Sequence, residues 1–125
     1  MIQYDKVTKV YNGGQHAVEN ITLNIDAGEF VSFVGHSGAG KTTLLKMLFA
    51  EVLPSEGTIY FSEKDVSKLS DQELLKLRRK IGTIFQDFRL LPTKNIYENI
   101  AFALEVAGKS DEDIKADVPH VLELV

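Results

Sequence analysis

The chain has no cysteine among its 125 residues, which excludes disulfide bridges and metal sites built on thiolates. It also has no excess of positive charge, because 14 lysines and arginines stand against 18 aspartates and glutamates, a formal net charge of −4. That balance argues against a general nucleic-acid binder, so no nucleic-acid partner is expected.

Long apolar runs are missing as well. No stretch approaches the roughly 18 residues that a membrane-spanning helix requires. The N-terminus, Met1–Lys6, lacks the basic start and apolar core of a signal peptide. No internal repeat or low-complexity tract is present. With 44% hydrophobic residues, the chain is predicted to form one modest cytosolic domain, or part of one, with a real core.

What the chain does contain is a glycine-rich motif. Residues 35–43, GHSGAGKTT, fit the P-loop pattern G-x-x-x-x-G-K-[ST]. We expect Gly35, Gly38 and Gly40 to adopt backbone angles that a side chain would forbid, so that successive N–H groups turn inward and bind an anion. The residues expected to contact the nucleotide are those of the motif: Gly35, His36, Ser37, Gly38, Ala39, Gly40, Lys41, Thr42 and Thr43.

Two side chains of the motif have distinct expected roles. Lys41 is placed to reach the β- and γ-phosphates, and the Thr42 hydroxyl to ligate the Mg²⁺ that bridges them. The positive end of the following helix adds to the attraction for phosphate. The predicted ligand is a nucleoside triphosphate with Mg²⁺, and the structural alternative is a glycine-rich turn with a solvated lysine.

The flanks of the motif agree with this assignment. Residues 29–34, EFVSFV, are mostly apolar and predict a strand buried on both faces. Residues 43–50, TLLKMLFA, predict a helix whose buried face carries Leu44, Leu45, Leu48 and Phe49.

The N-terminal region predicts antiparallel β structure that leads into this parallel core strand. An alternation of apolar and polar residues begins at Ile2–Tyr4 and is clearer at Ile21–Ile25. Asn12–Gly14 predicts a turn between these two segments. Residues 26–28 reverse the chain before the core strand, and Thr58–Phe61 restart β structure after the P-loop helix.

The next segment predicts a capped helix and a second core strand. Ser70 and Glu73 form a capping box at the start of a helix through Lys80, whose basic end is interpreted as a solvated face. Ile81–Phe85 predict a short buried strand that delivers Gln86 at its carboxyl edge, where ligands of open α/β sheets bind. Gln86 can equally be an ordinary polar residue that ends a strand.

Two amphipathic helices are predicted at the C-terminal end. The first starts with a capping box at Asn95 and Glu98, and the second at Ser110, with Pro119 expected to kink it. The apolar stripes are Ile100, Ala103, Leu104 and Ala107 on the first, and Ile114, Val118, Val121, Leu122 and Val125 on the second. Because the second stripe still runs at Val125, the chain is interpreted as the front part of a larger domain.

With these residues placed, the chain resembles the nucleotide-binding domain of ABC ATPases over its whole length. The segments that carry the resemblance are Gly35–Lys41, Leu77–Gly82, Ile84–Asp87, Leu90–Pro92 and Ile96–Phe102. The resemblance implies an α/β fold with a P-loop NTPase core and an N-terminal antiparallel β subdomain over residues 1–86. Residues 87–125 would then hold the Q-loop and the start of a helical subdomain.

The resemblance also implies roles for residues outside the P-loop. Tyr11 would stack on the adenine of ATP, and Gln86 would contact Mg²⁺ and sense the γ-phosphate, so that Lys41 and Gln86 are the catalytic candidates. The family's signature sequence, Walker B aspartate, catalytic glutamate and switch histidine would all follow Val125. The 125-residue chain is therefore predicted to bind ATP without hydrolysing it.

Within the family, the likeness is greatest to the cell-division ATPases. This implies a membrane subunit that docks on Gln86–Tyr97, a homodimer at full length, and a peripheral location on the inner face of the cell membrane. The ATPase of a lipoprotein-release or small-solute transporter is the alternative within the family. A binding-only nucleotide module, and a P-loop GTPase or small-molecule kinase, are alternatives of other classes. The GTPase is disfavoured because no Asn-Lys-x-Asp stretch is present.

Overall fold

The computed structural model describes all 125 residues, which form two compact units, Met1–Ile81 and Gly82–Val125. The expected division into subdomains after Gln86 stays a prediction.

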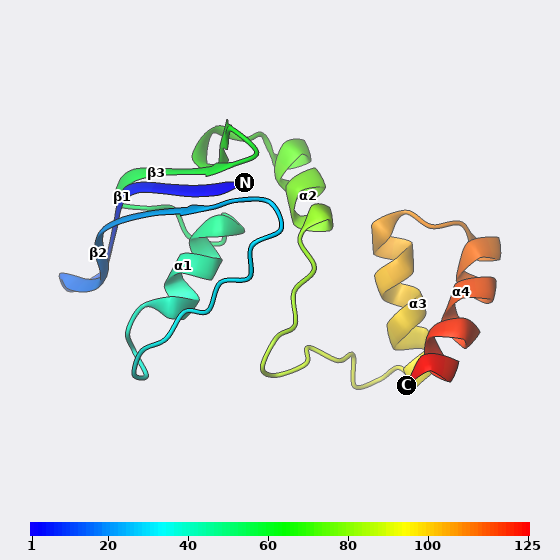
Figure 1. Cartoon of the computed structure of the whole chain (residues 1–125). Helices are drawn as coiled ribbons and strands as arrows, with labels where there is room; N and C mark the ends of the chain where they lie inside the picture. The colour runs from blue at the N-terminus through cyan, green and yellow to red at the C-terminus, as the bar shows by residue number, and fades with distance from the viewer. The chain divides into compact units, whose positions relative to one another are not determined.

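The first unit is built on one antiparallel sheet (Figure 1). Its strands are β1 (Ile2–Tyr11), β2 (Gln15–Ile25), β3 (Glu56–Phe61) and the short β4 (Lys64–Asp65), in the order β2-β1-β3-β4. The three strands predicted around Ile2–Tyr4, Ile21–Ile25 and Thr58–Phe61 are therefore confirmed, and β1 and β2 run further than their alternation indicated. The predicted turn joins them, with the Gly14 N–H donating to the Tyr11 carbonyl at 3.1 Å.

Helix α1 (Lys41–Leu48) covers one face of this sheet (Figure 1). Its buried residues are Leu44, Met47 and Leu48. Leu45 was expected on that face and is exposed, because the helix meets the sheet along the side that carries Met47. The Tyr4 hydroxyl donates to the Leu44 carbonyl at 3.1 Å, and burial raises the pKa of Tyr4 to about 12.

The core of the unit joins the sheet, α1 and the following helical segment. Its buried members are Tyr4, Val7, Val18, Leu44, Met47, Leu48, Ile59, Val66 and Leu77. Val66 begins a short 3₁₀ helix, η1 (Val66–Lys68), and Leu77 lies on α2 (Asp71–Lys80). These residues anchor the P-loop helix to the sheet.

Helix α2 starts with the predicted capping box. The Ser70 N–H and hydroxyl donate to Oε2 of Glu73 at 3.1 and 2.9 Å. The basic C-terminal end is not simply solvated, because the Arg78 guanidinium donates to the carbonyls of Phe49 and Ala50 at 2.9 and 3.4 Å. Arg78 thus binds carbonyl groups just beyond the C-terminal end of α1, where a cation is favourable.

The two predicted core strands are wrong for this chain. Neither residues 29–34 nor residues 81–85 form a strand, and Phe30, Val34 and Ile84 are 94%, 93% and 96% exposed. A strand requires hydrogen bonds to a neighbouring strand, and the sheet contains no parallel pair that would include these segments. Apolar composition alone therefore did not decide their structure.

The second unit is a helical hairpin of α3 (Ile96–Ala107) and α4 (Asp111–Leu124). Its small core is Ala101, Ile114 and Val118, packed with Ile100 and Leu104. The remaining predicted stripe residues, Ala103, Ala107, Val121, Leu122 and Val125, are exposed. The predicted stripes were broader than the faces that the two helices bury against each other within this unit. No helix of the chain is both long and apolar enough to span a membrane.

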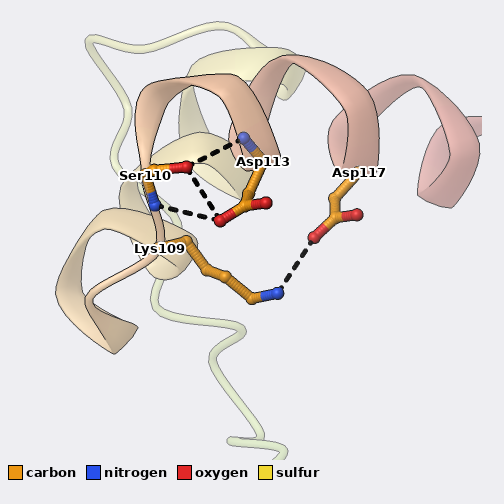
Figure 2. Close-up of polar contacts among 4 residues, drawn as sticks. All are labelled: Lys109, Ser110, Asp113 and Asp117. Atoms are coloured by element: carbon orange, nitrogen blue, oxygen red, sulfur yellow. Dashed lines mark hydrogen bonds and ion pairs between the residues drawn. The ribbon is translucent and has the colours of Figure 1, made fainter.

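Both helices of the hairpin are capped. The Asn95 side chain accepts from the Glu98 N–H at 2.9 Å, and α3 ends at Gly108, which has a left-handed φ of 87°. At α4, Ser110 and Asp113 form a reciprocal cap, and Lys109 pairs with Asp117 at 3.4 Å (Figure 2). Helix α4 continues through Pro119.

Candidate functional site

The P-loop is an exposed turn whose shape depends on two glycines. Gly38 and Gly40 have φ of 81° and 85°, the left-handed region that other residues rarely adopt. Gly35 does not share this conformation, so the expectation for that residue is corrected. A side chain at Gly35 is limited instead by space, since its Cβ would lie 3.1 Å from that of Ala39.

Gly40 also joins the loop to the sheet. A Cβ at this position would overlap the carbonyl oxygen of Ala17 and the side chain of Val18. Lys9 pairs with Val18 and Val10 pairs with His16, so Ala17 is an extra residue in β2 at this point. The irregularity brings the Ala17 carbonyl against the N-terminal end of α1, and only glycine allows so close an approach.

The Lys41 side chain folds back over the loop. Its Nζ donates to the carbonyls of Gly35 and His36 at 2.7 and 2.8 Å. An ammonium group has three N–H donors, so one remains for a phosphate oxygen. The same lysine thus braces the loop and places a positive charge beside the carbonyls of Gly35 and His36.

The other motif residues make contacts within the loop or begin α1. The backbone turn closes with the Ala39 N–H donating to the His36 carbonyl at 3.2 Å, and the His36 ring Nδ1 lies 2.7 Å from the Ser37 carbonyl. Thr42 is exposed and Thr43 is half-buried at the start of α1. The first turn of α1 contains no acidic residue, so no side chain there repels an anion.

Tyr11 ends β1 on the hairpin against which the P-loop packs. Tyr11 pairs with Gln15 across the hairpin. Two residues earlier on the same strand, Lys9 pairs with Val18, and Val18 lies against Gly40 of the P-loop. Tyr11 as a whole residue is 38% exposed, and the Lys9 Nζ lies 5.3 Å from the centre of its ring. Tyr11 and the P-loop therefore belong to one region of the first unit.

Gln86 lies in the second unit, within an exposed turn over residues 86–89. The turn is closed by the Phe88 N–H, which donates to the Phe85 carbonyl at 3.2 Å. The Arg89 guanidinium stacks over the Phe85 ring at 3.8 Å. The contact of Gln86 with Mg²⁺ and the γ-phosphate stays a prediction.

A hollow of about 750 Å³ follows this turn. Its lining is mostly apolar and consists of Leu90, Leu91, Pro92, Lys94, Asn95, Ile96, Tyr97, Asn99 and Ile100. Asn99 holds its wall in place, because its side chain bonds the backbone N–H of Leu91 at 2.8 Å and the Lys94 carbonyl at 3.0 Å. Asn99 was not predicted from the sequence, although an amide in the first turn of a capped helix can reach back to the preceding loop.

A second cavity, of about 410 Å³, lies between β3 and α2 and is lined by residues such as Phe61, Leu77 and Lys80. None of its lining residues belongs to the P-loop. The P-loop itself is an exposed loop on the surface.

Comparison with known proteins agrees with this geometry. Residues 18–125 match the family model described as ABC transporter. The whole chain is 46% identical to the cell division ATP-binding protein FtsE of Bacillus subtilis and 47% identical to that of Mycobacterium tuberculosis. It is 44% identical to the methionine import ATP-binding protein MetN 1 of Bacillus thuringiensis. The chain spans 55% of the length of each FtsE relative and 38% of MetN 1.

Solved structures resemble the chain as well. The dimeric ATP-binding cassette MJ0796 bound to ADP and Pi matches with a TM-score of 0.85 and 37% identity, over 98% of this chain and 56% of that one. The cassette cbiO1 from Clostridium perfringens matches with a TM-score of 0.80 and 29% identity, over 98% of this chain and 49% of that one.

Proposed function

The chain belongs to the ABC transporter family, and we propose that it forms the part of an ATP-binding subunit that holds MgATP. The observation that carries this proposal is the position of Lys41, whose Nζ sits between the carbonyls of Gly35 and His36. There it presents one free donor and a full positive charge to a phosphate. The ADP and Pi bound to the dimeric MJ0796 cassette support the choice of nucleotide.

Each part of the P-loop has a proposed task. The backbone N–H groups from Gly35 to Thr43 bind the phosphates, and Lys41 offsets the negative charge on the β- and γ-phosphates. The Thr42 hydroxyl and Gln86 would hold Mg²⁺, which would supply positive charge to offset the negative charge of the phosphates. In the complete protein, Lys41 and Gln86 are the catalytic candidates of this chain.

The base is proposed to stack on Tyr11. Stacking of a base on an aromatic side chain contributes about 1–3 kcal/mol, and the exposed ring of Tyr11 lies on the hairpin next to the P-loop. Tyr11→Phe should keep the affinity for MgATP, whereas Tyr11→Ala should lower it about 5- to 100-fold in titration calorimetry. Equal affinities for the two variants would show that Tyr11 only packs beside the turn.

We further propose that the complete protein acts with a membrane subunit, as an FtsE-type protein with an FtsX-like partner. The support is the 43–47% identity to FtsE relatives and the apolar hollow that follows Gln86. An apolar element of the partner would enter this hollow, since exposed apolar patches mark contact sites. The partner would bring the subunit to the inner face of the membrane.

The complete protein is also proposed to form a homodimer, which the dimeric structures of MJ0796 support. A methionine-import role is the second candidate, because the 44% identity to MetN 1 falls within the 43–47% range of the FtsE relatives. Co-purification with an FtsX-like subunit or with a transporter permease separates the two candidates.

The docking site itself can be tested by surface substitutions. Leu90 is 69% exposed and Leu91 is half-buried, and both line the hollow. Leu90→Asp and Leu91→Asp should weaken co-purification with the membrane subunit and leave the MgATP affinity near normal. Val106→Asp is the matched control, because Val106 is an exposed apolar residue of α3 outside the hollow. If all three variants retain the partner equally, the hollow is not the docking site.

A further inference from the structure

The ammonium group of Lys9 makes two contacts that bring distant segments together. Its Nζ donates to the carbonyl of Leu53 at 2.7 Å, and it lies 5.3 Å from the centre of the Tyr11 ring. Leu53 belongs to the link between α1 and β3. A cation within about 6 Å of an aromatic ring centre is attracted by the electrons on the face of the ring.

The strand explains why these two side chains meet. Lys9 and Tyr11 are two residues apart on β1, so their side chains project from the same side of the strand. The extra residue at this point, Ala17, belongs to the neighbouring strand β2 and not to β1. The alternation of side chains along β1 from Lys9 to Tyr11 is therefore kept. The bond to the Leu53 carbonyl then fixes the ammonium over the ring rather than leaving it in solvent.

We propose that Lys9 is a positioning residue for the nucleotide base, acting through Tyr11. This inference rests on the proposed stacking of adenine on Tyr11. Lys9 occupies one face of the ring and holds the ring in one orientation, so the opposite face is the one offered to the base. A side chain that is already ordered loses less conformational freedom when the ligand binds.

The surroundings of Lys9 differ from those of the lysine in the P-loop. Lys9 is held by a carbonyl and a ring rather than by a carboxylate, and no acidic side chain forms an ion pair with it. The proposed role of Lys9 is distinct from that of Lys41, because Lys41 donates hydrogen bonds to the P-loop carbonyls directly. Lys9 should therefore affect recognition of the base, and Lys41 recognition of the phosphates.

The test compares two ligands on the same protein preparation. MgATP has a base and magnesium tripolyphosphate has none, so the ratio of their affinities reports on base recognition and is insensitive to a partial loss of folded protein. Lys9→Met keeps most of the side-chain length and removes the charge. It should lower the affinity for MgATP about two- to fivefold and leave the affinity for tripolyphosphate unchanged in titration calorimetry.

Three further variants make the result specific. Lys9→Arg should restore the MgATP affinity, because a guanidinium also stacks on an aromatic ring. In a Tyr11→Ala background, Lys9→Met should have no further effect on the affinity ratio. Lys6→Met is the matched control, since Lys6 is another exposed lysine of β1 and should leave both affinities unchanged.

Each outcome decides a different point. If Lys9→Met weakens both ligands equally, Lys9 is a phosphate-attracting charge and the proposal is overturned. If it changes neither affinity, the contact with Tyr11 has no role in binding. If Tyr11→Ala itself leaves the affinity ratio unchanged, the proposed stacking fails rather than the role of Lys9 alone.

Discussion

The Nζ of Lys41 lies 2.7 Å from the carbonyl oxygen of Gly35, six residues earlier at the start of the same loop. One side chain thus closes the P-loop on itself and carries the charge that a phosphate would meet. Lys41 therefore braces the loop and is also the residue that we propose binds the phosphates.

Lys41→Ala should weaken MgATP binding about 10- to 100-fold. Hydrogen bonds to charged groups contribute about 1.5–3 kcal/mol each, and the variant loses both the charge and the brace. Titration calorimetry measures the loss. Lys46→Ala is the control, because Lys46 is on the same helix but outside the loop. Comparable effects of the two substitutions would contradict the assignment.

Thr42→Val should remove most of the Mg²⁺ dependence of ATP binding, because valine keeps the shape of threonine and lacks the oxygen ligand. Binding is measured with MgCl₂ and with EDTA. Thr43→Val, a substitution at the adjacent residue, should keep the dependence. Should EDTA weaken binding to the Thr42 variant as much as to the parent, Thr42 is not a metal ligand.

Gly40→Ala should destabilise the chain more than Gly28→Ala. Both glycines have φ of 85°, so both variants carry similar backbone strain, roughly 1–2 kcal/mol. Only Gly40 lies against Ala17 and Val18, whereas nothing lies within 4 Å of a Cβ at Gly28. The extra cost of overpacking, about 1–3 kcal/mol, should appear in urea unfolding. Equal costs would show that the loop moves away from β2 without penalty.

The caps of α2 and α4 should make folding sensitive to acid. The Ser110 hydroxyl and N–H donate to Asp113 (Figure 2) and hold the pKa of its carboxyl below its usual value. The backbone N–H and hydroxyl of Ser70 lower the pKa of Glu73 in the same way. A carboxyl with a lowered folded-state pKa stabilises the fold above its unfolded-state pKa, about 4, and this contribution is lost as the pH falls through the folded-state pKa.

The urea concentration at the unfolding midpoint should therefore decrease as the pH is lowered from 5 to 3. Asp113→Asn should make that decrease smaller. Glu112→Gln serves as the comparison, because Glu112 is in the same first turn but makes no hydrogen bond to Ser110. If both variants keep the full pH dependence, the cap does not contribute to it.

Local features of this fold could be predicted well from the sequence. The turn at Asn12–Gly14 and the starts of three helices follow from short-range hydrogen bonds within a few residues of the chain. The P-loop could be identified because its glycines and lysine are close together in the sequence, and its turn depends on backbone angles at those same residues. Its expected glycine conformations were right for Gly38 and Gly40 and wrong for Gly35.

The errors concern apolar residues whose fate depends on distant neighbours. Phe30, Val34 and Ile84 lie in segments with the composition of core strands, yet no strand of the chain pairs with them. Leu45 has the spacing of a core residue, but the sheet meets α1 on the side of Met47.

The sequence by itself therefore determined the P-loop turn, the helix caps and the antiparallel hairpin, because each depends on hydrogen bonds and backbone angles among residues near one another in the chain. The tertiary structure alone decided that Gly40 packs on Ala17, that Arg78 binds the carbonyls beyond the end of α1, and that Lys9 lies between Leu53 and Tyr11. These contacts join residues that are far apart in the chain or on different elements, and no local pattern encodes which surfaces will meet when the sheet and the helix pack.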